Sequence, residues 1–415
     1  MALSDILIVG AGHAGFHLAA ALRQAGYSGR VRLIGDEPGL PYQRPPLSKA
    51  YLAPDACDEM IEQRPQAFFA DNRIELVTPN SVMAIDRVGS AVELAGGQRI
   101  GYDHLVLATG ARNRQLAVPG ADLTGIFYLR TAEDARCLRA RLETCRQIVV
   151  IGAGFIGLEF AATAAKRGAR VTIIEQAERV MARAVSPEMS ACFERLHRSW
   201  GTEFMFGSGV AEITGRDGAV ATVETSDGHS IPADLVLVGI GVVPNAELAA
   251  AAGLPTDNGI LVDATMATAD PHVSAIGDCA SHPNPFAGRS IRLESVQNAS
   301  DQARLLAARL TGQACAPYAA VPWFWSDQGP AKLQIAGIAA PGDESVLRGD
   351  PDEGAFSVFR FRGGRLTAVE SLERPGDHMG GRQMLARNIP ITAEEAADPA
   401  FDLKVLLKAL PAAAE

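Results

Sequence analysis

The sequence predicts an α/β protein with two Rossmann-like folds followed by a C-terminal α+β domain. Three observations support this fold class. A strand, a glycine-rich turn, an alanine-rich helix and a second strand that ends in an acid occur near the N-terminus and again near residue 150. Each copy is followed by a later apolar strand that stops at a glycine turn. Beyond residue 322 the chain changes to short strand-like runs and closing helices near 380 and 400.

The two copies have the same four parts, and each is typical of a parallel βαβ unit. In the first copy the parts are a strand at 6–9, a turn at 10–15, a helix to about Gln24 and a strand that ends at Asp36. In the second copy they are a strand at 148–151, a turn at 152–157, a helix to about Lys166 and a strand that ends at Glu175. Residues near 80–100 alternate apolar and polar between glycines, which predicts a small antiparallel insertion.

Domain boundaries follow from the strands that close each fold. The buried strand 104–108 stops at Gly110, and the strand 234–238 stops at a turn that contains Gly241. We therefore assign residues 1–110 and 241–321 to one discontinuous nucleotide-binding domain, 111–240 to a second and 322–415 to the α+β domain.

Both turns carry the pattern GxGxxG in its informative context, after a strand and at the start of a helix. The first two glycines of each turn let the backbone approach a pyrophosphate, whose charge the helix N-terminus stabilises; these are Gly10, Gly12, Gly152 and Gly154. Asp36 and Glu175 are placed to accept hydrogen bonds from an adenosine ribose. Because an acid there repels a 2′-phosphate, Glu175 favours NADH over NADPH, a preference that the nearby Arg179 and Arg183 are able to weaken. The alternative for each turn is a tight strand-helix connection without a ligand.

Two dinucleotide folds imply two dinucleotides. Since a protein seldom needs two nicotinamides, we assign one of them to FAD as the resident redox group. The sequence therefore predicts a flavoprotein that passes electrons between NADH and FAD.

Charge, cysteine spacing and apolar runs exclude several other classes of protein. The net charge of -10 argues against general nucleic-acid binding. The six cysteines form no CxxC pair and no cluster with metal-ligand spacing, so we expect neither a redox disulfide nor a metal site. The N-terminus has no export signal, and no apolar run reaches the roughly 18 residues of a membrane span. We therefore expect a cytoplasmic protein with no membrane contact.

Over nearly its whole length, the sequence resembles the FAD-dependent ferredoxin reductases of oxygenase systems. The most specific matching segments are 44–49 (RPPLSK), the Gly277-Asp278 turn and 322–328 (PWFWSDQ). The resemblance implies that the N-terminal fold holds FAD and the second fold holds NADH, as two Rossmann-like dinucleotide-binding domains of the glutathione-reductase-like kind. It also implies that electrons pass from NADH through FAD to a [2Fe-2S] ferredoxin that supplies a monooxygenase or dioxygenase.

The resemblance assigns individual cofactor contacts by position. Those to FAD are Ala14, Asp36, Lys49, Val82, Arg130, Asp278 and Val296. We further predict cofactor contacts at Gly15, Arg44, Trp325, Ile156, Gly157, Arg183 and Gly241. Asp278 follows a buried strand, where its carboxylate is able to accept hydrogen bonds from the ribityl hydroxyls. Val296 begins a predicted helix to Leu310, whose positive N-terminus would stabilise negative charge on the reduced flavin.

Two side chains, Lys49 and Glu159, are predicted as the catalytic pair beside the flavin, with the lysine favouring the anionic reduced form. Without the resemblance, a surface lysine and an ordinary helix glutamate would be the preferred interpretation. Trp325 is predicted to shield the flavin edge; a plain core position is the alternative, because aromatic runs are more often buried.

A locally basic set of side chains in this acidic protein suggests a docking surface for an acidic ferredoxin. Its members are Arg289, Arg292, Arg304, Arg309 and Lys332. Scattered solvated charges are the alternative interpretation. Two other functions stay open. One is an NADH oxidase or peroxidase, although residues 40–48 lack the redox cysteine that peroxidases and water-forming oxidases use, and the other is a signalling flavoprotein of the apoptosis-inducing type.

Overall fold

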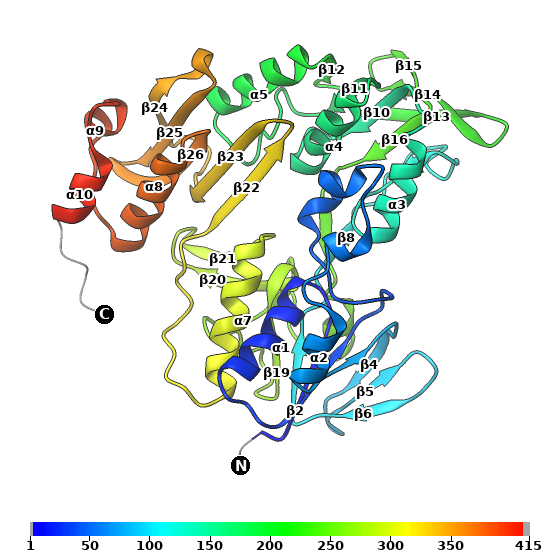
Figure 1. Ribbon diagram of the computed structural model, residues 1–415, viewed down its shortest axis with the longest axis vertical. Coiled ribbons are helices and arrows are strands. Elements are labelled where there is room, and N and C mark those ends of the chain that lie inside the picture. Colours follow the sequence, from blue (N-terminus) through cyan, green and yellow to red (C-terminus); the bar gives the residue numbers. More distant parts are fainter. Residues whose placement is uncertain (1–2, 410–415) are drawn as a thin grey trace. The chain divides into compact units, whose positions relative to one another are not determined.

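The computed structural model describes residues 3–409, which form two compact units (Figure 1). The first unit combines the described residues up to Arg44 with Cys57–Arg112 and Val242–Ala320. The second combines Pro45–Ala56, Asn113–Gly241 and the described residues from Val321 onward. The short segment Pro45–Ala56 therefore makes its contacts with chain that follows it by some hundred residues, a feature that the sequence did not reveal.

The first unit is built on a five-stranded parallel sheet in the order β19-β7-β1-β2-β3. Its strands are β1 (Asp5–Val9), β2 (Arg30–Ile34), β3 (Ile74–Val77), β7 (His104–Leu107) and β19 (Val273–Ala275). The helices are α1 (His13–Gln24), α2 (Gln66–Asp71), α6 (Glu247–Ala251) and α7 (Val296–Leu310). Helices α1 and α7 pack against each other (Figure 1). Strands β1 and β7 are almost entirely buried, which explains why they are continuous apolar runs rather than alternating ones.

Two small sheets complete the first unit. Strands β4 (Val82–Asp86), β5 (Ala91–Leu94) and β6 (Arg99–Gly101) form an antiparallel sheet. The insertion predicted near residues 80–100 is thereby confirmed. Strands β18 (Ile260–Leu261), β20 (Ala280–Asn284) and β21 (Arg289–Ile291) form the other sheet.

The second unit repeats the first architecture and then adds a different one. Its parallel sheet has the order β12-β11-β10-β16-β9. The strands are β9 (Ile126–Phe127), β10 (Gln147–Ile151), β11 (Arg170–Glu175), β12 (Thr202–Phe206) and β16 (Leu235–Val238), with helices α3 (Ala132–Arg141), α4 (Phe155–Lys166) and α5 (Pro187–Ser199). Strands β13 (Val210–Arg216), β14 (Ala219–Thr225) and β15 (Ser230–Pro232) form an antiparallel sheet. The predicted pair of Rossmann-like folds is therefore confirmed.

The remainder of the second unit is a five-stranded antiparallel sheet, β22-β23-β26-β25-β24, with three helices. Its elements are β22 (Trp323–Gln328), β23 (Ala331–Gly337), β24 (Glu344–Asp350), β25 (Ala355–Arg362), β26 (Arg365–Leu372), α8 (Pro375–Arg387), α9 (Ala393–Ala397) and α10 (Leu403–Ala409). We call this part the C-terminal domain. It is the predicted α+β domain. Within residues 3–409, no helix is long and apolar enough to cross a membrane.

Buried histidines predict that the fold loses stability in mild acid. Burial lowers the pKa of five histidines from the ordinary 6.5 to about 4; they are His13, His104, His197, His282 and His378. The unfolded chain binds these protons near pH 6.5 and the folded chain only near pH 4, so the free energy of unfolding falls as pH drops through that window. Each histidine is worth up to about 2 kcal/mol at pH 5.

We therefore expect the melting temperature to fall between pH 7.5 and pH 5, and to fall less in His104→Gln, which cannot bind the proton. Thermal unfolding followed by circular dichroism at a series of pH values checks this. A melting temperature that is flat over this range, or a variant that keeps the full wild-type slope, would show that these histidines do not control the acid response.

Candidate functional site

The first glycine turn contains glycines that the fold needs and one that it does not need. Gly10 has a φ of +112°, and a Cβ atom there would lie 2.1 Å from the carbonyl oxygen of Ala108. A Cβ atom at Gly15 would lie 2.0 Å from the carbonyl oxygen of Gly10. At Gly12, which precedes α1, a Cβ atom would meet no other atom within 4 Å. The packing of the protein therefore does not require a glycine at position 12, and the space beside it is open.

The second turn repeats this pattern residue by residue. Gly152 has a φ of +102°, and a Cβ atom there would approach the carbonyl oxygen of Gly239 to 2.5 Å. A Cβ atom at Gly157 would lie 2.3 Å from the carbonyl oxygen of Gly152, whereas a Cβ atom at Gly154 would meet no other atom within 4 Å. Neither α1 nor α4 has a side chain that caps its N-terminus. Free backbone N–H groups beside an open space are the donors that a dinucleotide pyrophosphate requires, so the residues fit two such groups.

The two predicted ribose-binding acids lie at or just beyond the ends of the strands that follow each turn. Asp36 is exposed two residues after β2 ends. Glu175 is the last residue of β11, and its carboxylate accepts hydrogen bonds from the N–H groups of Ala153 (2.7 Å) and Ala177 (2.8 Å). Because each carboxylate oxygen has a further acceptor site, Glu175 is held in place and remains able to bind a diol.

The structure settles how the two arginines near Glu175 differ. The guanidinium of Arg179 donates to the carbonyl oxygens of Ala182 (2.8 Å) and Val185 (2.9 Å), so it is used within its own loop. Arg183 is exposed, and its Nη2 atom would lie 3.9 Å from a Cβ atom at Gly241. The nucleotide contact of Arg183 stays a prediction, and Arg183 is the one of the two whose side chain is exposed beside Gly241. The predicted contact Ile156 lies in the first turn of α4 and is 44% exposed.

On the FAD side, several predicted residues lie around α1 and α7 of the first unit. Ala14 is buried in α1, and its Cβ atom would be 2.8 Å from a Cβ atom at Gly277. Asp278 follows Gly277 in a short 3-10 helix. Val296 is the first residue of α7, which ends at Leu310, so the predicted helix is confirmed. The structure thus brings Ala14 close to the turn that carries Asp278.

Arg44 and Val82 also belong to the first unit. Arg44 forms an ion pair with Glu37 at 2.5 Å, and its guanidinium lies 5.4 Å from the ring centre of Tyr42. Tyr42 in turn donates a short hydrogen bond to Glu37. Val82 begins β4 and is half-buried. The contacts of Arg44 fix its side chain against the loop that follows Asp36.

Lys49 and Glu159 form an ion pair in the second unit, with 2.6 Å between Nζ and Oε2. Lys49 lies in the Pro45–Ala56 segment and its side chain is 21% exposed, whereas that of Glu159, in α4, is only 3% exposed. Two hydroxyl groups also donate to the Glu159 carboxylate, Ser48 at 2.5 Å and Ser326 at 2.7 Å. Three donors fix the orientation of the Glu159 carboxylate, which in turn holds the Lys49 side chain in one position.

The hydrogen-bond network behind this pair extends into the C-terminal domain. Gln328 donates to the hydroxyl of Ser326 at 3.2 Å, and its side-chain oxygen lies 2.9 Å from Nε2 of His197. Ser48, Ser326, Gln328 and His197 were missed by sequence reasoning. Small polar residues in a strand or a 3-10 turn carry no periodic signal. Ser48, Ser326 and Gln328 do lie in the segments 44–49 and 322–328 that carry the family resemblance, but nothing in those segments indicated a contact with Glu159.

Two further predicted FAD contacts also belong to the second unit. Arg130 lies just before α3, and its backbone N–H donates to Asp134 at 2.9 Å. Trp325 lies in β22 and is half-buried, with its ring 5.7 Å from that of Trp323. Neither position by itself tests a flavin contact, so both stay predictions.

The predicted docking residues do not form one set. Arg309, in α7, donates to the hydroxyls of Ser274 (2.5 Å) and Thr265 (3.2 Å), so its side chain serves the fold. Arg304, in the same helix, pairs with the neighbouring Asp301. Arg289 lies in β21 and is exposed, and Lys332 is exposed on β23 of the other unit.

Comparison with known proteins places these sites in context. Residues 4–303 match the family model described as pyridine nucleotide-disulphide oxidoreductase, and residues 323–407 match the one described as reductase C-terminal. Rhodocoxin reductase of Rhodococcus erythropolis is 54% identical over 403 residues, which are 97% of this chain and 94% of that protein.

Solved structures agree with these family matches. The ferredoxin reductase for the CYP199A2 system of Rhodopseudomonas palustris has a TM-score of 0.95 and 52% identity, over 97% of this chain and 99% of that one. Putidaredoxin reductase in its covalent complex with putidaredoxin also has a TM-score of 0.95, with 40% identity over 99% of both chains. With its two glycine turns and its antiparallel C-terminal domain, this chain belongs to the pyridine nucleotide-disulphide oxidoreductase family, among the ferredoxin reductases of oxygenase systems.

Proposed function

We propose that the protein passes electrons from NADH through bound FAD to a [2Fe-2S] ferredoxin that supplies an oxygenase. The observation that carries this proposal is the pair of glycine turns that each keep a space open at a helix N-terminus, at Gly12 and Gly154. Two such spaces support two dinucleotides. Full-length likeness to reductases, one of them solved in complex with its ferredoxin-type partner putidaredoxin, supports the acceptor.

We assign FAD to the first Rossmann-like fold and NADH to the second. Gly10, Gly12, Ala14, Asp36, Asp278 and Val296 would hold FAD, and Gly152, Gly154, Ile156, Glu175, Arg183 and Gly241 would hold NADH. The positive end of the α7 dipole lies at Val296, where it would stabilise negative charge on a bound flavin. The division into three domains and a cytoplasmic location remain predictions from the sequence.

When bound, FAD supplies the conversion of a two-electron donation into one-electron steps. The chain contributes position and charge. Glu159 orients the Lys49 ammonium, and Lys49 would supply a positive charge where negative charge develops on the flavin. Ser48, Ser326 and Lys49 all donate to Glu159, so this carboxylate would act by holding the Lys49 side chain in place.

The ferredoxin would bind at exposed basic residues. We retain Arg289 and Arg304 of the first unit for this role and omit Arg309, whose guanidinium is bonded inside that unit. Lys332, in the second unit, stays a separate prediction. Arg292 is omitted for a similar reason, since it pairs with Glu294 at 2.6 Å and its side chain is 8% exposed.

Replacing Glu175 by serine is expected to shift the nucleotide preference from NADH toward NADPH. The carboxylate charge that repels a 2′-phosphate would be lost, and Arg183 would remain nearby. We expect the ratio of kcat/KM for NADH to that for NADPH to fall by at least about tenfold, the equivalent of about 1.4 kcal/mol. Steady-state kinetics with both nucleotides measures this ratio. An unchanged ratio would mean that Glu175 does not lie at the ribose.

The acceptor is tested by mixing the NADH-reduced holoenzyme with three oxidants in separate experiments: a [2Fe-2S] ferredoxin, oxygen and hydrogen peroxide. Our proposal predicts that ferredoxin reoxidises the flavin much faster than either small oxidant. Faster reoxidation by oxygen or peroxide would identify an oxidase or peroxidase. Slow reoxidation by all three, with tight NADH binding, would identify a signalling flavoprotein.

A further inference from the structure

The loop between β11 and α5, residues 176–186, lies against the second glycine turn. The backbone N–H of Met181 donates to the carbonyl oxygen of Ala153, inside that turn, at 2.9 Å. Met181 has a φ of +49°, a left-handed conformation that an unbranched side chain adopts only when its surroundings impose it. Arg183 lies in the same loop, beside Gly241. The position of this loop therefore decides where Arg183 and the turn meet a nucleotide.

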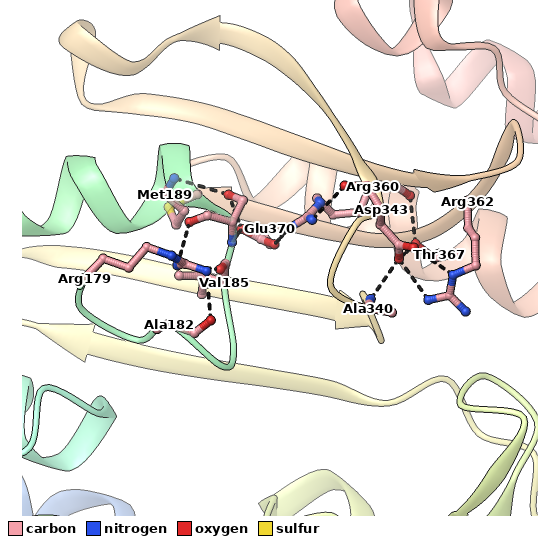
Figure 2. A network of polar contacts seen from close by, with 11 residues as sticks. Arg179, Ala182, Val185, Met189, Ala340, Asp343, Arg360, Arg362, Thr367 and Glu370 are labelled. Carbon is pink, nitrogen blue, oxygen red and sulfur yellow. Dashed lines mark hydrogen bonds and ion pairs between the residues drawn. The ribbon is translucent and has the colours of Figure 1, made fainter. Parts of the chain in front are cut away.

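Arg179 holds the loop together through hydrogen bonds to the backbone of the loop itself. Its guanidinium binds the carbonyl oxygens of Ala182 at 2.8 Å and Val185 at 2.9 Å, and it lies 3.4 Å from that of Ser186 (Figure 2). One planar group with several donors thus ties together both ends of the segment that carries Arg183.

The same loop is held from outside by the C-terminal domain. Glu370, in β26, accepts two hydrogen bonds at one oxygen, from the backbone N–H of Ser186 at 2.8 Å and from its hydroxyl at 2.7 Å. Ser186 also caps α5, because its hydroxyl oxygen accepts from the N–H of Met189 at 3.2 Å. Figure 2 shows Glu370 lying between the loop and the strands of the C-terminal domain. Glu370 is therefore a direct polar link from that domain to the end of the loop. A second link reaches the middle of the loop, where Gln328 donates to the sulfur of Met181 at 3.5 Å.

The second oxygen of Glu370 is bound on the opposite side by Arg360 at 3.1 Å. Arg360 also donates to the carbonyl oxygen of Asp343 at 3.0 Å. The Asp343 carboxylate is fixed by Arg362 at 2.7 and 2.9 Å and by Thr367 at 2.9 Å (Figure 2). Hydrogen bonds through Arg360 and Asp343 therefore hold the Glu370 side chain in the position from which it binds Ser186.

A role in stability alone does not account for this carboxylate. Glu370 is 1% exposed, and burying a charged pair costs desolvation energy that a packed apolar pair would avoid. Burial accordingly raises the pKa of Glu370 above its ordinary value. The carboxylate instead fixes the position of Ser186. One of its oxygens accepts from Arg360, and the other accepts from the backbone N–H and the hydroxyl of Ser186.

We propose that Glu370 is a positioning residue for the NADH site, which fixes the 176–186 loop so that Met181 and Arg183 meet the nucleotide. This rests on the proposed function, because it takes the second glycine turn to be the NADH site. The C-terminal domain would then control affinity for the pyridine nucleotide through Ser186, without contacting the nucleotide itself.

Two variants test this from the two sides of the contact. Glu370→Gln keeps the shape of the side chain but replaces one acceptor oxygen by an NH2 donor. That NH2 group must then point at the donors of either Ser186 or Arg360, and the hydrogen bonds on that side are lost. Ser186→Ala removes only the hydroxyl and tests the same link if the first variant fails to fold. The matched control is Asp377→Asn, a buried carboxylate of the same domain whose partners are Arg348, Ser357 and Arg374.

Binding of NAD⁺ and of ADP-ribose to each FAD-loaded protein is measured by isothermal titration calorimetry, and the rate of flavin reduction at saturating NADH by stopped flow. We expect both test variants to raise the dissociation constants about three- to thirtyfold, with the saturated rate and the flavin spectrum unchanged. The control should bind as the wild type does.

Wild-type affinity in both test variants would overturn the proposal and leave the proposed function intact, as would equal weakening in the control. A wild-type protein that binds neither NAD⁺ nor ADP-ribose would overturn the proposed function itself, and this inference with it.

Discussion

Gly12→Val is expected to give a protein that folds but carries no flavin. A Cβ atom at Gly12 meets no protein atom within 4 Å, and the backbone φ of -75° is open to any residue. Its side chain would instead fill the space next to the free N–H groups of α1 and deny them to a pyrophosphate. Loss of two or more charge-assisted hydrogen bonds lowers the affinity for FAD by at least about a hundredfold.

The measurement is the ratio of flavin to protein absorbance after gel filtration, together with the unfolding curve of the apoprotein. Gly154→Val is the matched variant in the second turn, and we expect it to keep its flavin and to lose NADH binding. Gly10→Ala should behave differently from both, since its Cβ atom would lie 2.1 Å from a backbone oxygen and would damage the fold. Full flavin content in Gly12→Val, or loss of flavin in Gly154→Val instead, would contradict the assignment of the two folds.

Lys49→Met is expected to slow the reduction of the flavin by NADH by about 10²- to 10³-fold, the cost of removing one preorganised charge from a reacting centre. The fold should persist, because methionine has a similar shape and Glu159 keeps the hydroxyl donors Ser48 and Ser326. Lys49→Arg keeps the charge but changes its position, so we expect an intermediate rate.

Anaerobic stopped-flow reduction at saturating NADH measures this rate, and the NADH concentration dependence shows whether binding has changed as well. A rate within about twofold of the wild type in Lys49→Met would mean that the ion pair with Glu159 is only structural. Wild-type affinity for NADH with a slow reduction step would place Lys49 at the flavin.

The sequence patterns predicted correctly the two βαβ units, whose structure depends on interactions between residues close in the sequence. The expected helix ends at Gln24 and Lys166 match α1 and α4, because a strand, a glycine turn and an alanine-rich run specify a βαβ unit within some thirty residues. The glycine positions follow from the same backbone geometry. The spaces at Gly12 and Gly154 confirm that these two residues are not needed by the packing.

Long-range polar contacts could not be predicted in this way. Lys49 and Glu159 are 110 residues apart, and only a resemblance to a known family joined them. The link between Ser186 and Glu370 spans 184 residues and has no motif at either end. Arg309 shows the same limit, since it was predicted as part of a basic docking surface, but its guanidinium donates to the hydroxyls of Ser274 and Thr265.

The most direct test of the account is the visible spectrum of the purified protein during anaerobic titration with NADH and, separately, with NADPH. The account predicts flavin absorption bands that are bleached rapidly by NADH and slowly by NADPH, with the colour returning when a [2Fe-2S] ferredoxin is added. A purified protein without flavin bands, or a flavin that NADH does not bleach, would contradict it.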